Sequence, residues 1–526
     1  MRKVAWVSFW VLATLAVHFL AAKWIGRALL TNDGYQYLDA AGHLLARNGL
    51  ATSVAHFDEQ VAWGKLPVPL THFPPGYPIA IAAVAALGLV PLDAAYILSI
   101  AGFVATTLLL LHAWRRLGLD PFAAAMLCLV WIGNGYALLF STVLGPGALF
   151  IVCTTGFAVC ILLDLQADGR RPWLLLLMGL AIGLSFALRY AGLFFIPSLG
   201  MYLAWRAWRT PTARSLAFGG AAMAALLAIP ILVRNTVITG TWRGGHSSGN
   251  GHTVAEVARE FLTAPFHIGL GDNAPISTGL WTALLLATGC FLVWTLAARW
   301  KTPPPPVWPA YTLPALVWFA ILSGGYVAGI VLTELTTIAA ATHYYLPVYP
   351  IVLIAAGMAF RLATSVRARV ALVLCVLPVL AVNALSVVYP RSLSSEREVA
   401  RLMNGEVEPG VPLRQWLQGR LRPGSVLFST NGQAVYWVLR QPVVSIIDGG
   451  STSQEWTPAA LRDLMAKYRA TYLMVFPGAG RYAVLEQYNI PLFGQLAAGE
   501  SPEWLRIAAR TPGVIVYECS GCAQPR

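Results

Sequence analysis

The sequence predicts a polytopic helical membrane domain followed by a small water-soluble α/β domain. Of its 526 residues, 57% are hydrophobic and 11% are charged, whereas an ordinary soluble domain has about 25% charged residues. The apolar residues come in long runs, and short stretches with basic residues separate these runs. After Pro390 acidic residues accumulate. We therefore expect lipid to surround most of the chain and water to surround its last part.

Each long apolar run is expected to be a transmembrane helix. A helix needs about 17 to 25 mostly apolar residues to cross a bilayer core, and lipid offers no partner for an unpaired backbone amide. Examples are Val4 to Leu20, Leu216 to Val233, Leu280 to Leu296 and Val370 to Val387. The first run follows Arg2 and Lys3. Because no convincing small-residue cleavage site follows it, we expect a retained anchor.

The net charge of +13 does not indicate a nucleic-acid partner, because the basic residues form short clusters between apolar runs. These residues indicate the membrane topology instead. Such clusters mark the cytoplasmic ends of spans. They are Arg2/Lys3, Arg115/Arg116, Arg170/Arg171, Arg206/Arg209/Arg214, Arg299/Lys301 and Arg361/Arg367/Arg369. The connections Ser141 to Gly147 and Thr333 to Thr342 lack basic residues. The pattern predicts about eleven crossings, with the N-terminus in the cytoplasm and the C-terminus on the other side.

For the connections to alternate between the cytoplasmic and the non-cytoplasmic side, Tyr77 to Val90 must not be a span. The segment has about 14 mostly apolar residues, which is short for a span, and Pro74-Pro75-Gly76 and Pro91 flank it. Counting it as a span would move Arg115 and Arg116 to the non-cytoplasmic side. We therefore expect a first non-cytoplasmic loop from about Lys23 to Asp93. This loop contains two helices on the membrane surface, Gly34 to Arg47 and Tyr77 to Val90.

A second unusual segment, Trp173 to Trp205, is bounded by basic clusters at both ends. It must cross and return, yet it is too short for two full spans. We expect a short, sunken hairpin whose tip is at Arg189-Tyr190. This would hold Arg189 at the depth of the lipid phosphates.

Residues 391–526 are expected to form a separate α/β domain on the non-cytoplasmic side, after a membrane domain of residues 1–390. They hold 11 of the chain's 23 acidic residues. Short β-rich runs alternate with helical stretches, as in an α/β unit. The expected strands are Ser425 to Ser429, Val443 to Ile447, Thr471 to Phe476 and Gly513 to Glu518, and the expected helices are Gln433 to Leu439 and Pro458 to Arg469.

Asp33 is the acidic residue most suited to a catalytic role. It follows the first span in Asn32-Asp33-Gly34-Tyr35, at the start of the first surface helix. Its spacing favours an N-cap, whose carboxylate accepts bonds from the first free amides of the helix. A cap also fixes the carboxylate at the lipid boundary, as a general base requires.

Several other polar residues have both a structural and a functional interpretation. Arg234 follows a span, and its structural interpretation is a snorkelling residue at the membrane interface. His343 opens another span within an aromatic belt. The loop Gly244 to Gly251, with His246 and Asn250, is either a connector or a cover for a sugar. Cys519-x-x-Cys522 favours a local disulfide in an oxidising compartment.

The order of these elements resembles the GT-C superfamily of membrane glycosyltransferases, closest to the branch related to protein mannosyltransferases. The resemblance covers about residues 1–390. It rests on Asp33-Gly34-Tyr35-Gln36-Tyr37-Leu38-Asp39-Ala40-Ala41, His72-Phe73-Pro74-Pro75-Gly76-Tyr77-Pro78, Leu188-Arg189-Tyr190-Ala191-Gly192-Leu193, Val233-Arg234-Asn235 before a Gly-rich loop, and His343-Tyr344-Tyr345-Leu346-Pro347-Val348-Tyr349-Pro350.

The resemblance implies transfer of a hexosyl or pentosyl group, with inversion, from a polyprenyl-phosphate donor to an acceptor outside the cytoplasm. The membrane would be a bacterial inner membrane. Asp33 would be the general base. The donor phosphate would be bound by Arg189, Arg234 and His343. Candidate substrate-loop residues are His72, Tyr77, His246 and Asn250.

The sequence departs from this family pattern at two positions. A second acidic residue often follows a proline after the third span, but here the stretch reads Leu144-Gly145-Pro146-Gly147-Ala148. The first acidic site is often a pair, but Asn32 precedes Asp33. No clear second acidic ligand for a divalent metal is present, so the metal requirement stays open. A transporter or flippase of lipid-linked substrates, which usually shows repeated halves, and a catalytically degenerate scaffold subunit are the alternatives.

Overall fold

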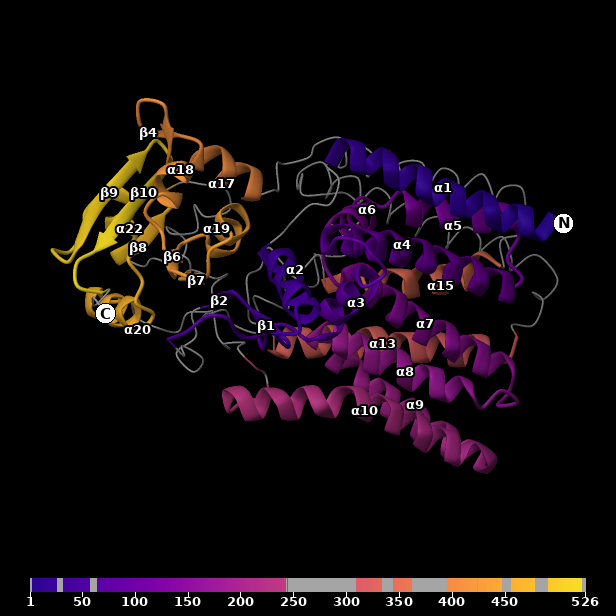
Figure 1. Cartoon of the computed structure of the whole chain (residues 1–526). Helices are drawn as coiled ribbons and strands as arrows, with labels where there is room; N and C mark the ends of the chain where they lie inside the picture. Colours follow the sequence, from indigo (N-terminus) through magenta and orange to yellow (C-terminus); the bar gives the residue numbers. More distant parts are fainter. Residues whose placement is uncertain are drawn as a thin grey trace. The chain divides into compact units, whose positions relative to one another are not determined.

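The computed structural model describes residues 2–25, 32–56, 64–242, 244, 309–333, 344–361, 395–422, 424–446, 456–477 and 491–522 (Figure 1). The chain separates into two compact units. The helical unit comprises Met1–Ala28, Tyr96–Ile231 and His252–Arg391. The α/β unit comprises Leu29–Ala95, Leu232–Gly251 and Ser392–Arg526.

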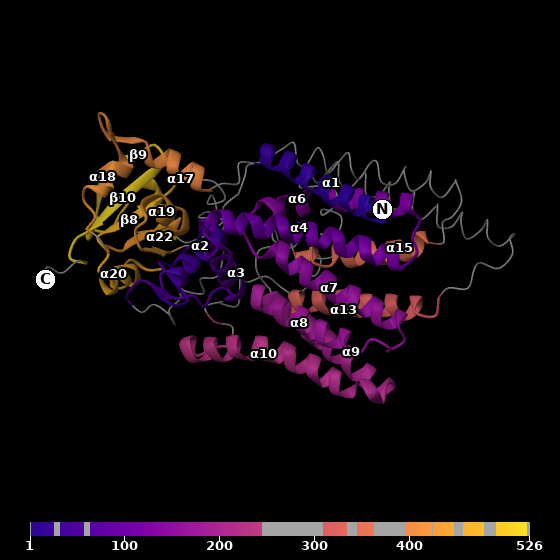
Figure 2. The ribbon, with the colours of Figure 1, turned by 45° about the vertical axis from the view of Figure 1, so that its right-hand side comes forward.

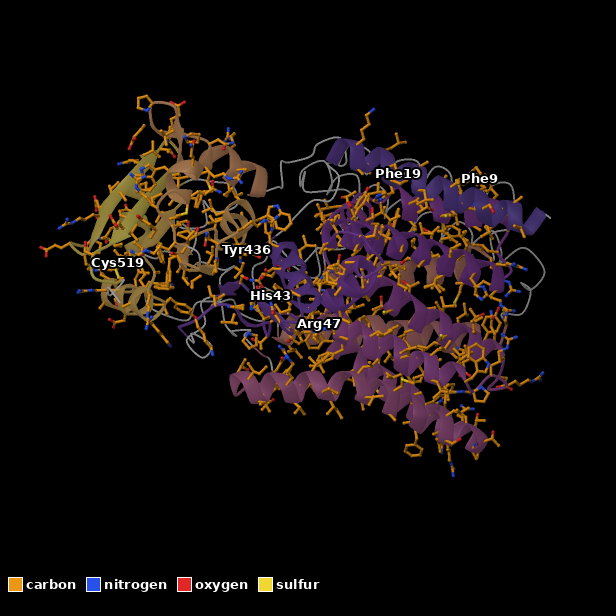
Figure 3. The ribbon with its side chains drawn as sticks, in the orientation of Figure 1. Phe9, Phe19, His43, Arg47, Tyr436 and Cys519 are labelled. Atoms are coloured by element: carbon orange, nitrogen blue, oxygen red, sulfur yellow. A yellow bond between two sulfur atoms is a disulfide. The ribbon has the colours of Figure 1, made fainter. Side chains whose placement is uncertain are left out.

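Apolar helices make up most of the described residues between positions 2 and 361. They are α1 (Arg2–Ile25), α4 (Pro91–Arg116), α5 (Pro121–Ile132), α6 (Gly135–Thr142), α7 (Gly147–Gln166), α8 (Leu174–Leu188), α9 (Ile196–Arg209), α10 (Arg214–Thr239), α13 (Thr312–Thr333) and α15 (Tyr349–Phe360). Helix α7 packs beside α8 and α13, which both views show (Figures 1 and 2). On α1, Phe9 and Phe19 are 59% and 55% exposed, as lipid-facing side chains would be (Figure 3).

Five of the described helices are long and apolar enough to cross a membrane. They are Val4–Lys23, Pro91–Arg116, Gly147–Gln166, Pro211–Thr239 and Thr312–Leu332. Helices α5 and α6 pass the same test as a pair, with a bend of 55° between them. The expected spans Leu280 to Leu296 and Val370 to Val387 are not among the described residues, so the total of eleven stays a prediction.

The two helices expected in the first loop are present and short. Helix α2 covers Asn32–Leu45, and α3 covers Gly76–Ala85. At 1.5 Å per residue the ten residues of α3 extend about 15 Å, which is half of a bilayer core. The structure therefore agrees that this segment is too short to be a span. Helix α3 ends before the predicted Val90, and Gly88 follows it with a φ of +99°.

The expected hairpin breaks where the sequence predicts. Helix α8 ends at Leu188, Arg189 is extended with φ −146° and ψ 135°, and the 3₁₀ helix η1 (Tyr190–Phe195) follows. A Cβ atom on Gly192 would lie 2.4 Å from the backbone nitrogen of Phe186. Only glycine therefore lets η1 fold back against the end of α8.

Buried polar groups connect the apolar helices of the helical unit. The Arg206 Nε atom of α9 lies 2.7 Å from Asp164 Oδ2 of α7, and the Tyr202 hydroxyl donates to the same oxygen at 2.7 Å. His18 of α1 bonds Ser141 Oγ at 2.9 Å and the Tyr96 hydroxyl at 2.8 Å. Because each group has a partner, these contacts fix helix packing without leaving a buried charge alone.

The C-terminal segment folds around a six-stranded sheet, in the order β2-β7-β6-β8-β10-β9. Strands β2 (Val54–His56), β7 (Val443–Ser445), β6 (Leu427–Ser429) and β8 (Tyr472–Val475) are parallel, whereas β10 (Val514–Cys519) is antiparallel to β8 and to β9 (Leu505–Thr511). The helices are α17 (Ser395–Met403), α18 (Leu413–Gln418), α19 (Gly432–Leu439), α20 (Pro458–Lys467) and α22 (Pro491–Ala498). Two short ladders join β1 (Ala51–Thr52) to β3 (Val68–Pro69) and β4 (Glu406–Glu408) to β5 (Val411–Pro412).

One strand of this sheet does not belong to the C-terminal segment. Strand β2 comes from the first loop and pairs with β7, with Val54 opposite Val443 and His56 opposite Ser445. The Val443 amide also donates to the Ser53 carbonyl oxygen at 3.0 Å. The domain boundary predicted from the sequence groups the first loop with the membrane helices. In the structure it packs with residues 392–526 in one compact unit.

Candidate active site

Asp33 lies in the first turn of α2 and is exposed. The helix begins at Asn32, so Asp33 is inside the helix and not at the predicted N-cap position. The partial positive charge of a helix N-terminus still favours a carboxylate in the first turn. An exposed carboxylate at a fixed helix end can accept a proton from a bound hydroxyl group.

Helical spacing divides the side chains of α2 between two faces. Tyr37 is four residues after Asp33 and therefore shares its face. Tyr35, Asp39 and His43 follow one another at intervals of four on a different face. Tyr35, Tyr37 and Asp39 are 0%, 3% and 8% exposed. The helix is thus packed on both faces, whereas Asp33 in its first turn is exposed.

An aromatic cluster packs the loop with the motif His72 to Pro78 against α2. The Tyr37 ring centroid lies 4.9 Å from that of Phe73 and 5.1 Å from that of Tyr77. Tyr77 is 1% exposed, and its hydroxyl donates to the Ala95 carbonyl oxygen at 3.4 Å. His72 is half-buried, with its ring 4.6 Å from Phe73. The structure therefore packs Tyr77 within this cluster, and its predicted contact with substrate stays a prediction.

Arg234 of α10 contacts the base of the same loop. Its Nη1 atom donates to the Leu70 carbonyl oxygen at 2.7 Å, and its Nη2 atom donates to that of Leu50 at 3.3 Å. These two residues flank the ladder between β1 and β3. Charge-assisted bonds to two carbonyl groups fix the loop more firmly than neutral bonds would. Arg234, predicted to snorkel at the interface or to bind phosphate, thus also holds the first loop through two hydrogen bonds that neither prediction included.

The start of the Gly-rich loop also contacts the His72 loop. Asn235 is fully buried, and its Nδ2 atom donates to the Trp242 carbonyl oxygen at 3.3 Å. Gly244 has a φ of +70°, and a Cβ atom on it would lie 2.2 Å from the Thr71 carbonyl oxygen. Only glycine fits this close approach. His246 and Asn250 are not among the described residues.

Arg189 belongs to the helical unit and is half-buried. Its guanidinium carbon lies 5.6 Å from the centroid of the Tyr344 ring, which is a cation–π distance. Tyr344 follows His343, which the structure does not describe. Two motifs that lie about 150 positions apart, one at Arg189 and one beginning at His343, therefore meet in this unit.

Gly147 occupies the position where the resemblance places a second acid. It is the first residue of α7, and a Cβ atom on it would lie 2.5 Å from Cδ1 of Phe140. Close packing therefore explains the glycine. Among the residues with described positions, no three His, Cys, Asp or Glu side chains gather as a metal site.

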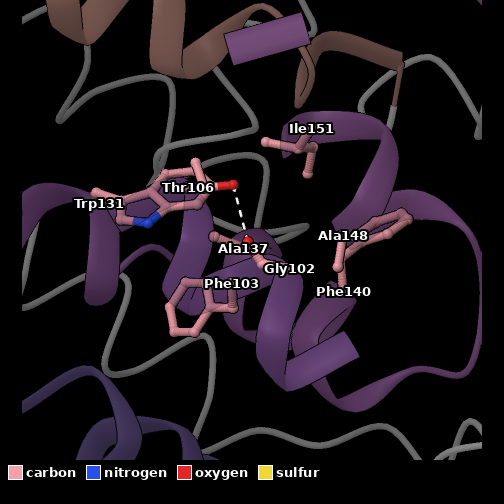
Figure 4. A pocket seen from close by; sticks show the side chains of 8 residues that line it. All are labelled: Gly102, Phe103, Thr106, Trp131, Ala137, Phe140, Ala148 and Ile151. Atoms are coloured by element: carbon pink, nitrogen blue, oxygen red, sulfur yellow. Dashed lines mark hydrogen bonds between the residues drawn. The ribbon is translucent and has the colours of Figure 1, made fainter. Parts of the chain in front are cut away.

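The cavity in Figure 4 does not suit a sugar or a phosphate. Its volume is about 10 Å³, and it is lined by Gly102, Phe103, Thr106, Trp131, Ala137, Phe140, Ala148 and Ile151. The Thr106 hydroxyl donates to the Gly102 carbonyl oxygen at 3.0 Å within α4. The space holds at most one water.

Asp39 is a buried polar residue that the sequence analysis did not single out. One carboxylate oxygen accepts from Thr52 Oγ1 at 3.0 Å and from the Ser53 amide, and the other accepts from the Tyr436 hydroxyl. The spacing of Tyr35, Asp39 and His43 marks a common helix face. Nothing in the sequence indicates that its partner is 397 positions away.

Comparison with solved structures identifies the fold. No family model matches the sequence, and no curated protein matches it significantly. The chain is similar to ArnT from Cupriavidus metallidurans bound to undecaprenyl phosphate, with 16% identity over 99% of each chain and a TM-score of 0.57. It is also similar to the Archaeoglobus fulgidus oligosaccharyltransferase AglB in complex with an inhibitory peptide and a dolichol-phosphate, with 14% identity, 98% and 75% of the two chains and a TM-score of 0.52.

A third similar structure is the mycobacterial arabinofuranosyltransferase AftD, at 13% identity over 99% of this chain and 40% of that one, with a TM-score of 0.50. These proteins share the GT-C fold. The chain therefore has the fold of the GT-C membrane glycosyltransferases, as the sequence predicts. Together with its apolar helices, this fold makes the chain an integral, multi-pass membrane protein.

Proposed function

We propose that the chain is a membrane glycosyltransferase that moves a hexosyl or pentosyl group from a polyprenyl-phosphate donor to a non-cytoplasmic acceptor. The observation that carries the proposal is the exposed Asp33 carboxylate in the first turn of a packed helix. The GT-C fold over the whole chain supports it. The donor's tail would stay in lipid while its head group reaches the helix pair α2 and α3.

In this reaction the acceptor hydroxyl oxygen attacks the anomeric carbon of the donor sugar. The bond from that carbon to the phosphate oxygen breaks, and the polyprenyl phosphate leaves with the bonding electrons. Asp33 takes the proton of the attacking hydroxyl group. A single direct displacement inverts the anomeric configuration, and one carboxylate base suffices for it.

The departing phosphate needs cations that are already in place. We assign this role to Arg189, to His343 and to Arg234. Arg189 lies at the break between α8 and η1, and packing against Tyr344 holds its guanidinium group. Arg234 also supports the loop through Leu50 and Leu70. Replacing Arg234 would disturb both the support of the loop and the binding of phosphate. Replacing Arg189 therefore tests phosphate binding more cleanly.

We place the α/β unit on the non-cytoplasmic side of a bacterial inner membrane, with the N-terminus in the cytoplasm. The basic clusters at span ends support this orientation. A second, independent support is the disulfide between Cys519 and Cys522, because disulfides persist in oxidising compartments.

A transfer assay separates this proposal from the alternative of a flippase. Membranes containing the chain would be supplied with a polyprenyl-phosphate sugar that is radiolabelled in the sugar. The proposal expects label to leave the lipid and appear on an acceptor, with inverted configuration. Movement of the intact lipid-linked sugar across the bilayer, without transfer, would show a transporter instead.

A further inference from the structure

We propose that the C-terminal segment positions the catalytic helix through one hydrogen bond, which the Tyr436 hydroxyl donates to the Asp39 carboxylate. This inference rests on the proposed function of Asp33. Asp39 and Tyr436 act as positioning residues, because each acts on the reaction only through α2. The contact joins α2, the chain's second helix, to α19, far along the sequence. Figure 3 labels Tyr436 of α19 and His43 of α2.

The Asp39 carboxylate is held by donors from two further segments. Its side chain is 4% exposed. Oδ2 accepts from Thr52 Oγ1 and from the Ser53 amide, where β1 leads into β2. Oδ1 accepts from Tyr436. A carboxylate with three donors has one orientation, so α2, the β1–β2 corner and α19 are fixed relative to one another.

His43 completes the network on the same face of α2. Its Nε2 atom lies 2.9 Å from Ser53 Oγ and 3.7 Å from Asp39 Oδ1. Asn48 Nδ2 lies 3.5 Å from His43 Nδ1. When Asn48 donates to Nδ1, the proton of a neutral imidazole is on Nε2, where it points to Ser53 and Asp39. In this tautomer the histidine adds a donor to the network.

A second contact supports α2 closer to Asp33. The Tyr35 ring centroid lies 5.7 Å from that of Trp437, the residue after Tyr436. The guanidinium carbon of Arg440 lies 3.7 Å from the Trp437 centroid, and this cation–π contact holds the indole in place. Tyr35 and Asp39 are about one helical turn apart, so α19 contacts α2 at two points on the same face.

The position of α2 matters because a general base works only within hydrogen-bond reach of its proton. A shift of about 1 Å in a catalytic group lowers the rate by roughly 100-fold. The network therefore controls the chemical step more than it controls donor binding, since the donor phosphate is assigned to other residues.

The hydroxyl of Tyr436 can be removed without opening the apolar core of the sheet. That core lies among β6, β7, β8 and α20 and includes Phe428, Val444, Leu461 and Leu473. Tyr436 is not part of it. The change Tyr436→Phe therefore removes the link and leaves the core intact. A matched control is Tyr472→Phe, because Tyr472 is a buried tyrosine whose hydroxyl makes no hydrogen bond among the described residues.

The experiment uses the full chain in membranes and measures kcat and the donor KM per accumulated protein. We expect Tyr436→Phe to lower kcat by about 10- to 100-fold with the donor KM unchanged. Asp39→Asn, which keeps the shape of the side chain, should have the same effect. The double variant should lose no more than Asp39→Asn alone, because the bond that Tyr436→Phe removes is one of those that Asp39→Asn already alters. Tyr472→Phe should behave as wild type.

Asp33→Asn is assayed alongside, so that two failures can be told apart. If Asp33→Asn is inactive but Tyr436→Phe and Asp39→Asn keep wild-type kcat, the positioning inference is wrong and the proposed chemistry stands. A rise in donor KM at constant kcat would also overturn the inference. If Asp33→Asn retains full activity, the proposed chemistry itself is wrong. Should Tyr436→Phe accumulate poorly, Asp39→Asn gives the same readout.

Discussion

The Arg234 guanidinium group donates a 2.7 Å hydrogen bond to the carbonyl oxygen of Leu70. With its second bond, to Leu50, it closes the base of the loop that leads to α3. An arginine that the sequence marks as a lipid-interface or phosphate residue therefore has a role in folding the first loop. This role can be measured separately from activity.

Arg234→Ala should destabilise the protein by about 2 kcal/mol, because hydrogen bonds to charged groups contribute about 1.5 to 3 kcal/mol each and this side chain is only half-buried. The measurement is the unfolding of the purified protein in detergent. Arg214→Ala is the control, since Arg214 is exposed and donates one bond, to Ala207. Equal stability of the two variants would contradict the assigned contact.

Gly244→Ala should destabilise the protein more than Gly240→Ala does. Both glycines have positive φ angles, +70° and +77°, so either change costs about 1 kcal/mol in backbone strain. A Cβ atom on Gly240 would meet nothing within 4 Å, whereas one on Gly244 would lie 2.2 Å from Thr71. The added overlap costs about 1 to 3 kcal/mol. Thermal unfolding compares the variants, and equal midpoints would argue against the close approach.

Stability at high pH should depend on Tyr436. Burial, followed by the nearby Asp39 carboxylate, raises the pKa of Tyr436 above its usual value of 10. Above pH 10 the unfolded chain loses this proton while the folded chain keeps it. The folded state is then penalised, and stability falls as pH rises toward the raised pKa. Tyr436→Phe should reduce this fall between pH 10 and 11. Identical pH profiles of the unfolding midpoint would refute the shift.

The pair Cys519 and Cys522 should be oxidised in growing cells. In a chain whose other cysteines are replaced by alanine, a maleimide that adds mass should modify denatured protein only after reduction. The reason is that the structure pairs these sulfurs and that a non-cytoplasmic compartment is oxidising. Modification of both thiols without reduction would indicate a reducing compartment and overturn the orientation of the α/β unit.

The sequence predicted those parts of the fold that depend on local pattern. The length of Tyr77 to Val90 and the basic clusters separated α3 from the spans, and the paired apolar stretches around Arg189 located the hairpin tip. The strands β6, β7 and β8 lie within the predicted β-rich runs, and β10 overlaps its run but ends one residue later, at Cys519. In each case a single residue type, or a single repeat of hydrophobic residues, extends over several neighbouring positions and indicates the element.

Contacts between distant segments were not predictable in this way. Strand β2 has three residues, which is too short for an alternation pattern to reveal. The bond between Asp39 and Tyr436 depends on that pairing, because β2 brings the first loop to α19's sheet. The requirement for glycine at position 147 arises from Phe140 across a turn. These features follow from three-dimensional packing and not from the residues nearby in sequence.

The most direct test of the account compares Asp33→Asn with Asp93→Asn in the transfer assay. Asp93 is also an exposed acid in the first turn of a helix, α4, so it controls for the loss of one such charge. We predict that Asp33→Asn lowers transfer by at least about 100-fold, as expected when a general base is removed. Asp93→Asn should transfer as wild type does. Undiminished transfer by an Asp33→Asn protein that accumulates normally would contradict the assignment of Asp33 as the base.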